Sequence, residues 1–275
     1  MKNFIQRAIT GILFVSVIVG SMLIDKLAFS ALFLIVTGLT LWEFYSLVNQ
    51  GDKASINKFA AVAVGLILYI SATVWQYSIS IGIATVGLYI LGCMSIAIYE
   101  LFRQKGNPLH NWAYFFLGQV YIVAPFLMLN LLNNLFGIEF LLALFALIWV
   151  YDSGAYLFGV TLGKHRLFER ISPKKSWEGA IGGFLAACGI SLIFANFSPS
   201  LPIIGWLGFA TLVVIFGTFG DLSESLLKRT FNIKDSGDIL PGHGGMLDRF
   251  DSLLFATPII LFYLLLLLTG SNLAQ

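Results

Sequence analysis

Long apolar stretches separated by short polar segments dominate this chain. Nine stretches approach the roughly 20 residues that a helix needs to cross a hydrocarbon core of about 30 Å. They are Ala8–Ile24, Leu27–Val48, Phe59–Tyr77, Ile79–Leu101, Trp112–Leu132, Ile138–Phe158, Trp177–Phe197, Ile203–Leu222 and Leu253–Thr269. No internal repeat, low-complexity tract or long linker separates them. The pattern predicts an all-α, polytopic integral membrane protein with about nine transmembrane helices.

The first stretch follows a short basic start, which secretory signals share. It is long for a signal core, however, no small-x-small cleavage site ends it, and eight more stretches follow. We therefore expect it to be retained as the first helix. The spans also contain many glycines, such as Gly179, Gly182 and Gly183, which suit close helix packing in lipid.

The positions of the basic residues predict how the spans are oriented. If the N-terminus is cytoplasmic, fifteen of the 16 Lys and Arg residues fall in cytoplasmic segments and only Lys26 lies outside. Cytoplasmic segments are where Lys and Arg concentrate. The count predicts an N-inside, C-outside topology with two large cytoplasmic loops, Gly159–Ser176 and Ser223–Ser252. Glu43 and Glu100, near cytoplasmic ends of spans, are expected to extend toward the interface.

Composition supports the membrane assignment and excludes other classes. Hydrophobic residues make up 58% of the chain and charged residues 11%, with a mean hydropathy of +0.89, far from the values of a soluble domain. The formal net charge of +2 gives no reason to expect nucleic-acid binding. Cys93 and Cys188 lie inside apolar runs, so they are expected to pack in the core without disulfide or metal chemistry.

Polar residues of functional types gather after about Trp149. We therefore divide the chain into an N-terminal transmembrane scaffold, residues 1–137 with spans one to five and a possible role in dimerisation, and a catalytic transmembrane region. That region covers residues 138–275 and contains spans six to nine with the two large cytoplasmic loops.

The densest polar segment runs from Ser223 to Asp251 between the last two spans. Its cationic side chains, Lys228, Arg229 and Lys234, suit phosphoryl oxygens. Each basic pair in the loops also fits a simple role as a topology determinant.

Three carboxylates at this membrane surface predict a cation site. Asp248 and Asp251 are three residues apart and share one face if the last helix begins there, and Asp221 ends the eighth span. Mg²⁺ normally takes one or two carboxylates together with waters and substrate phosphates, so the set suits a metal-nucleotide site. A bland alternative is a local Asp248–Arg249 ion pair at a helix start.

The spacing of polar residues from Ser225 to Asp251 resembles the signature of the phosphatidate cytidylyltransferase family. The matching positions are Ser225, Lys228-Arg229, Lys234-Asp235, Leu240-Pro241, His243-Gly244-Gly245 and Asp248-Arg249-Phe250-Asp251. Two upstream segments, 151–156 and 172–179, are also similar to family members. The resemblance is specific over the C-terminal half, whereas the first five spans match mainly as hydrophobic helices.

The resemblance implies that the phosphate of phosphatidic acid attacks the α-phosphorus of CTP, with release of pyrophosphate. It implies catalytic roles for Lys228, Arg229, Lys234, Asp235 and His243. It implies substrate binding by Ser172, Lys174, Lys175, Ser176, Glu178, Ser223, Arg249 and Asp152. It implies that Asp221, Asp248 and Asp251 bind one or two Mg²⁺ ions, with a second, monovalent ion as an option. By residue type alone, His243 and Asp235 also fit loop positions without chemistry.

The resemblance further implies a homodimer, with CTP and phosphatidic acid as substrates and the lipid bilayer as a partner. The absence of organelle-targeting features predicts a bacterial inner membrane, and the positions of the basic residues predict that the site faces the cytoplasm. A secondary transporter would also show many spans and intramembrane carboxylates, but transporters place charge near the midplane in two related halves. Here the polar groups cluster at one face in one half. Another transferase that uses CTP or a lipid phosphate, such as a polyprenol kinase-like enzyme, is the other alternative.

Overall fold

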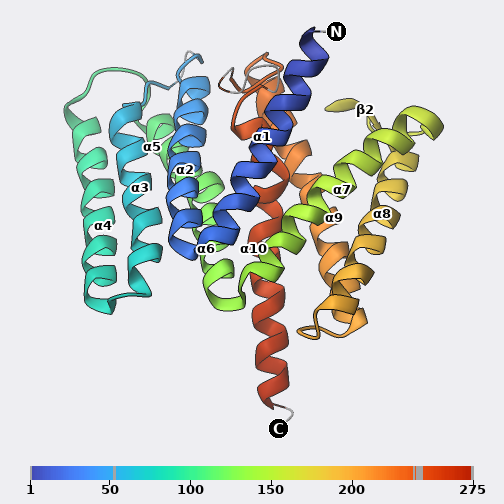
Figure 1. The fold of residues 1–275 in the computed structure, drawn as a ribbon. Helices are drawn as coiled ribbons and strands as arrows, with labels where there is room; N and C mark the ends of the chain where they lie inside the picture. Colours follow the sequence, from blue (N-terminus) through green and yellow to red (C-terminus); the bar gives the residue numbers. More distant parts are fainter. Residues whose placement is uncertain (1, 52–53, 238, 240–243, 274–275) are drawn as a thin grey trace. The chain divides into compact units, whose positions relative to one another are not determined.

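The protein is built almost entirely of helices (Figure 1). A computed structural model describes the whole chain except residues 1, 52–53, 238, 240–243 and 274–275. The elements are α1 (Lys2–Ile24), α2 (Lys26–Val48), α3 (Lys58–Trp75), α4 (Ile79–Phe102), α5 (Pro108–Gly118), the π-helical turn η1 (Gln119–Val123), α6 (Ala124–Phe136), α7 (Ile138–Leu162), β1 (Arg166–Phe168), β2 (Ser172–Ser176), α8 (Trp177–Phe197), α9 (Ile203–Thr230) and α10 (Leu247–Leu273).

The predicted all-α, polytopic membrane architecture is confirmed. Within the described residues, eight helices are long and apolar enough to cross a membrane, and a shorter apolar helix, Ile9–Ile24, corresponds to the first predicted span. The segments α5, η1 and α6 together form one of the eight, Pro108–Phe136. The π-helical turn inserts an extra residue into that span without ending it.

Several predicted span ends differ from the structure by four residues or more, and two of these differences affect polar residues at C-terminal helix ends. Helix α7 continues to Leu162, and α9 continues eight residues past Leu222 to Thr230. A hydropathy profile ends a span where polar residues begin. A helix can continue beyond that point as long as its backbone groups are hydrogen-bonded and its apolar side chains lie on the face that packs against the protein. In the first large loop, residues 166–176 form a short antiparallel hairpin of β1 and β2.

The chain forms two compact units. The first contains residues 1–134 and 230–250, and the second contains residues 135–229 and 251–275. In the first unit α2 packs against α1, α3 and α5, and α3 packs against α4. The ring of Phe250 lies 5.5 to 5.6 Å from the rings of Phe14, Phe33 and Phe126, so the segment 230–250 shares an aromatic core with the N-terminal helices.

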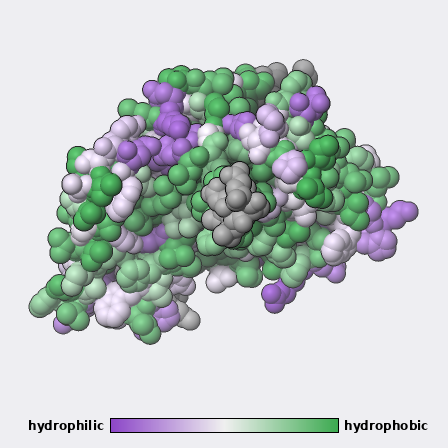
Figure 2. Space-filling view, turned by 90° about the horizontal axis from the view of Figure 1, so that it is seen from below, coloured by the Kyte–Doolittle hydropathy of each residue, from purple (hydrophilic) through white to green (hydrophobic). Residues whose placement is uncertain are grey.

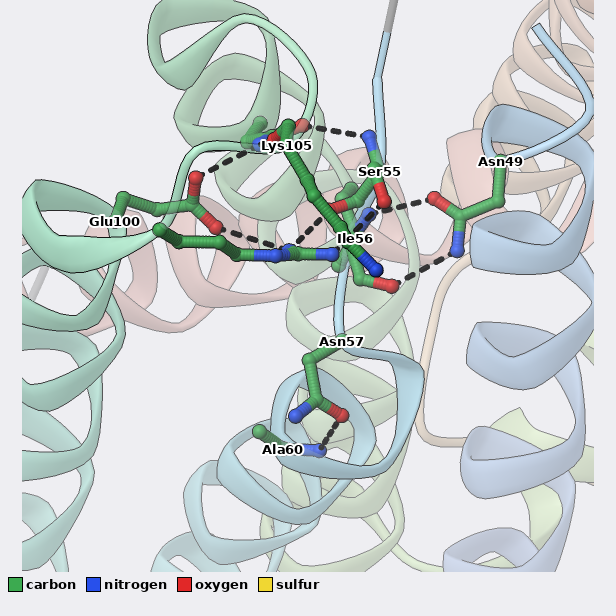
Figure 3. Close-up of polar contacts among 9 residues, drawn as sticks. Asn49, Ser55, Ile56, Asn57, Ala60, Glu100 and Lys105 are labelled. Carbon is green, nitrogen blue, oxygen red and sulfur yellow. Dashed lines mark hydrogen bonds and ion pairs between the residues drawn. The ribbon is translucent and has the colours of Figure 1, made fainter.

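A polar network joins the end of α4 to the loop between α2 and α3 (Figure 3). Glu100 accepts hydrogen bonds from Arg103 at 3.2 Å and from Asn111 at 2.8 Å, and Arg103 also donates to the backbone oxygen of Ser55. Glu100 is only 5% exposed. The expectation that it extends to the interface is therefore wrong, because its carboxylate is satisfied inside the protein.

Large hydrophobic side chains remain exposed along several helices, as on Ile83, Leu91 and Met94 of α4. Figure 2 shows a face on which hydrophobic residues predominate and hydrophilic residues gather in small patches. Lipid tails solvate such side chains as well as a protein core does. The exposed apolar surface therefore fits a bilayer and not water.

In the second unit, glycines bring α7 and α8 together. A Cβ atom at Gly183 would lie 2.6 Å from the carbonyl oxygen of Tyr151, and one at Gly179 would lie 2.6 Å from that of Ala155. Side chains at either position would therefore push the helices apart. This packing supports the sequence-based expectation for these glycines, and it fixes the start of α8 beside the polar half of α7.

Candidate functional site

The hairpin between α7 and α8 is fixed by two side chains at the start of α8. The Ser176 hydroxyl accepts a hydrogen bond from the backbone N–H of Gly179 at 3.2 Å and caps the helix. Glu178 accepts from the backbone N–H groups of Lys164 and His165 and contacts the His165 ring at 2.6 Å. Both residues therefore have structural roles, and direct substrate contact by either remains a prediction.

Lys175, at the end of β2, forms an ion pair with Asp221 of α9. Each side chain is 28% exposed, so the pair is partly shielded from water. The other oxygen of Asp221 accepts a hydrogen bond from the Ser225 hydroxyl, one turn further along α9, at 3.3 Å. The hairpin thus delivers one cationic side chain to the carboxylate that was predicted at the end of the eighth span.

Gly220 brings α9 close to the start of α10. A Cβ atom there would collide with the backbone carbonyl oxygen of Asp251 and lie 3.1 Å from the Cα atom of Ser252. Asp221 follows Gly220 directly, so the close approach of the two backbones also brings Asp221 near Asp251. The Asp251 carboxylate accepts a hydrogen bond from the Ser252 N–H at 2.6 Å.

Asp152, Asp221, Asp251 and Lys175 form an electrostatic cluster, because Asp251 lies within interaction range of the other three. When ionised, three carboxylates and one ammonium leave an excess of negative charge, which repels itself in a partly desolvated site. A bound cation would relieve that repulsion. Asp152 comes from α7, so three helices and the hairpin contribute to this cluster.

The cluster fits a hydrated divalent cation and not a closed metal cage. Among the described residues, no three His, Cys, Asp or Glu side chains converge closely enough to enclose a metal ion. Mg²⁺ retains several waters and is commonly held by one or two carboxylates plus substrate phosphates. Asp221 and Asp251 supply two oxygen donors of the required type.

A hydrogen bond between Tyr151 of α7 and Thr218 of α9 joins two of the helices that carry the cluster. Its hydroxyl lies 2.6 Å from the Thr218 hydroxyl, which itself donates to the carbonyl oxygen of Val214 at 2.7 Å. The single hydroxyl proton of Thr218 is therefore used, so Tyr151 is the donor. The bond ties α7 to α9 one residue before Asp152 and three residues before Asp221.

Lys228 and Arg229 lie in the last turn of α9, where the sequence had predicted a loop. Lys228 forms an ion pair with Glu224 at 2.5 Å, and the Glu224 side chain is fully buried. Arg229 is exposed. The predicted phosphate ligand Lys228 therefore already has an anionic partner, and a phosphate would have to compete with it or bind beside it.

In the first unit, residues 231–246 form what we call the motif loop, described except at 238 and 240–243. One oxygen of Asp248 accepts hydrogen bonds from the Ser236 N–H, the Ser236 hydroxyl and the Gly245 N–H at 2.9 to 3.0 Å. This oxygen therefore links Ser236 and Gly245 of the loop to the start of α10. Metal binding by Asp248 remains a prediction.

The remaining predicted residues occupy several environments. Lys234 and Asp235 are exposed in the motif loop, and Arg249 is exposed on α10. Ser223 is half-buried on α9, Ser172 is half-buried on β2, and Lys174 is exposed on β2. His243 lies outside the described residues.

Sequence reasoning missed three residues that these clusters use: Glu43, Glu224 and Tyr151. Glu224 had a usable signal, since it precedes Lys228 by one helical turn. Tyr151 had only the family resemblance of the segment 151–156, because by residue type an aromatic residue in a span ordinarily predicts packing. Glu43 was expected at the interface, but it is 4% exposed and accepts a hydrogen bond from the Leu247 N–H at 2.9 Å; that expectation is wrong.

Comparisons with known proteins identify a matching family and similar chains, one of them over nearly the full length. A family model described as "Cytidylyltransferase family" matches residues 5–267. The phosphatidate cytidylyltransferase of Bacillus subtilis is 32% identical over 97% of this chain and 99% of its own length. That of Haemophilus influenzae is 34% identical over 84% of this chain and 79% of its own. That of Staphylococcus aureus is 46% identical, but over 45% of this chain and 48% of its own.

Proposed function

Because this chain belongs to the cytidylyltransferase family, we propose that it is a phosphatidate cytidylyltransferase, which converts CTP and phosphatidic acid to CDP-diacylglycerol and pyrophosphate. The observation that carries the proposal is the cluster of Lys175, Asp221 and Asp251 within a chain that matches such enzymes over nearly its whole length. A transporter would not need a lysine for phosphate and two carboxylates for a cation gathered at the end of the β1–β2 hairpin.

In the proposed reaction, an ionised phosphate oxygen of phosphatidic acid forms a bond to the α-phosphorus of CTP. The bond between that phosphorus and the bridging oxygen to the β-phosphate breaks, and pyrophosphate leaves with the electron pair. The attacking oxygen carries no proton to remove, so no general base is required. Catalysis then depends on positioning and on neutralising charge.

Asp221 and Asp251 would hold the divalent cation, which we propose to be Mg²⁺. When bound, it would neutralise phosphate oxygens and orient the triphosphate. Lys175 would hold Asp221 in place and face the same phosphates. We retain Asp248 as a possible additional metal ligand in this proposal.

The exposed basic residues are proposed to bind the triphosphate or the lipid phosphate. They come from β2, α9, the motif loop and α10: Lys174, Arg229, Lys234 and Arg249. Lys228 would contribute from its pair with Glu224. Proposed supporting roles in binding or catalysis fall to Asp152, Ser172, Ser176, Glu178, Ser223, Asp235 and His243.

The site is proposed to face the cytoplasm, where CTP is found. The support is the distribution of basic residues, fifteen of 16 on one side of the predicted topology. The enzyme would be a multi-pass protein of the bacterial plasma membrane. A homodimer is also proposed, on the family resemblance.

The direct test is release of pyrophosphate by the detergent-purified protein. We expect release from CTP only when both phosphatidic acid and Mg²⁺ are present, with CDP-diacylglycerol formed in equal amount. Diacylglycerol in place of phosphatidic acid is the control, because it lacks the attacking phosphate. Release without phosphatidic acid, or phosphorylation of a lipid alcohol by CTP, would contradict the proposal and favour a lipid kinase.

Replacing Lys175 is expected to separate chemistry from membrane topology. Lys175→Ala should lower kcat/KM for CTP by about 10- to 100-fold, because it removes the partner that orients Asp221. Lys164→Ala is the matched control: it removes one exposed lysine from the segment just before the hairpin, away from the ion pair, and should change kcat/KM by less than about threefold. Steady-state kinetics at saturating phosphatidic acid measures both. Equal losses in the two variants would contradict a specific role for Lys175.

A further inference from the structure

The N-terminal helices hold the motif loop through one buried carboxylate. Glu43, on α2, is 4% exposed. One of its oxygens accepts a hydrogen bond from the Leu247 N–H at 2.9 Å and lies 3.4 Å from the Ser236 hydroxyl. A buried carboxylate is costly to desolvate unless backbone and side-chain donors satisfy it. Glu43 meets this condition at one oxygen, through the Leu247 N–H from the far end of the sequence, while its other oxygen is buried and has no hydrogen-bond partner among the described residues.

The contact falls on the first residue of α10. The first four N–H groups of a helix have no partner within the helix, and the helix dipole favours a negative charge there. Glu43 supplies both an acceptor and a charge to Leu247. Because Asp248 follows Leu247 directly on α10, the bond anchors the helix start that carries Asp248.

Two residues of the loop approach this carboxylate closely because they are glycines and have no Cβ atom. A Cβ atom at Gly237 would lie 2.6 Å from one oxygen of Glu43, and one at Gly245 would lie 2.6 Å from the other. Any side chain at these positions would displace either the loop or the Glu43 carboxylate from its present place. The backbone at Gly237 and at Gly245 therefore lies close to the two oxygens of the carboxylate.

Apolar contacts fasten the two ends of the same segment to the N-terminal helices. Phe231 lies against Gly51 and has its ring 6.4 Å from that of Tyr114 on α5. Phe250 packs among Phe14, Phe33 and Phe126. These contacts hold the ends of the segment whatever residue occupies position 43. Glu43 is therefore needed for the exact placement of the loop and the α10 start, and less for keeping the segment attached.

We propose that Glu43 is a positioning residue for the reaction: its carboxylate fixes the motif loop and the first turn of α10, although it contacts neither substrate nor metal. This inference rests on the proposed function. It assigns to the N-terminal spans a direct part in arranging the catalytic residues, beyond scaffolding and dimerisation.

Two conservative substitutions of Glu43 separate the effect of side-chain length from the effect of charge. Glu43→Gln keeps the length of the side chain and an oxygen acceptor for the Leu247 N–H, so we expect kcat within about tenfold of the unsubstituted enzyme. Glu43→Asp keeps the charge but withdraws the acceptor by one methylene, so we expect kcat to fall by about 10- to 100-fold, the range for residues that orient catalytic groups. Both variants should remain monodisperse in detergent, since the apolar contacts are unchanged.

Glu100→Gln and Glu100→Asp are the matched controls. Glu100 is also a buried carboxylate near the end of an N-terminal helix, but its partners are Arg103 and Asn111. These variants should lower the unfolding temperature without changing kcat per folded molecule. The same pattern in the Glu43 variants would overturn the inference, as would a Glu43→Asp enzyme with full kcat or a Glu43→Gln enzyme no better than Glu43→Asp.

Different results would contradict the proposed function and the positioning role of Glu43. Unsubstituted enzyme that releases no pyrophosphate from CTP and phosphatidic acid would overturn the proposed function. Active unsubstituted enzyme with kcat unchanged by Glu43→Asp would leave the function in place and overturn the positioning role.

Discussion

Asp251→Asn and Asp221→Asn are each expected to lower the rate of CDP-diacylglycerol formation by on the order of 10²- to 10³-fold, the scale for removing one preorganised charge-stabilising group. Asparagine keeps the size of aspartate and an oxygen that can accept the Ser252 N–H at position 251. The substitution therefore removes charge with little change in packing. Initial rates of pyrophosphate release at saturating CTP and phosphatidic acid measure the loss.

A thermal measurement separates metal binding from a general loss of activity. Mg²⁺ that binds the folded state should raise the unfolding temperature of the unsubstituted protein, by mass action. Both Asn variants should lose that rise. Without Mg²⁺, Asp251→Asn should unfold no earlier than the unsubstituted protein, since it relieves repulsion among Asp152, Asp221 and Asp251. Asp221→Asn also removes the ion pair with Lys175, so for this variant the measure is the difference between unfolding with and without Mg²⁺.

Glu139→Gln is the control for these carboxylates. Glu139 lies in the same unit, in the first turn of α7, and accepts a hydrogen bond from the Ser198 hydroxyl at 2.9 Å. Its variant should keep both the activity and the Mg²⁺-dependent rise. Asn variants that retain activity within about threefold, or that still respond to Mg²⁺, would show that Asp221 and Asp251 do not form the metal site.

The membrane helices were predictable because a span is a local property. About 20 apolar residues in a row predict a helix whatever surrounds it, and the structure confirms the spans. The end of α9 was not predictable from hydropathy. The last turns of α9 contain charged residues, which lower the local hydropathy. One of these residues, Glu224, is nevertheless fully buried and forms an ion pair with Lys228 within the helix.

The candidate site was predictable in its residue types and less so in its arrangement. Asp221 and Asp251 stood out as carboxylates at the ends of spans, but their proximity depends on the absence of a side chain at Gly220. Local capping also went unrecognised: Ser176 caps the start of α8, and Glu178 accepts hydrogen bonds from the residues before the hairpin, while substrate contact by either residue stays a prediction.

The role of Glu43 could not be predicted from the sequence, because its contacts are distant along the chain. Its hydrogen-bond partners Ser236 and Leu247 lie 193 and 204 residues away. An isolated carboxylate near a span end normally extends to the interface, and no neighbour within several turns indicates otherwise. Only the tertiary structure places the motif loop over it.

Gly220→Ala is expected to damage both stability and catalysis, because the new methyl group would collide with the carbonyl oxygen of Asp251, a backbone atom that cannot rotate away. Overpacking of this kind costs about 1–3 kcal/mol of unfolding free energy. Displacement of Asp221 from Asp251 by about 1 Å should lower kcat by about 10²-fold. The unfolding temperature in detergent and kcat measure the two effects.

Gly217→Ala is the matched control on the same helix. A Cβ atom there would lie 3.5 Å from the Cβ atom of Ser252, an ordinary van der Waals contact. Alanine also favours the helix over glycine by about 1 kcal/mol, so Gly217→Ala should be as stable as the unsubstituted protein or more so, with unchanged kcat. If Gly220→Ala behaves like Gly217→Ala, the close approach of α9 to α10 does not set the distance between the two carboxylates. If only Gly220→Ala loses activity, that backbone contact is part of the catalytic geometry.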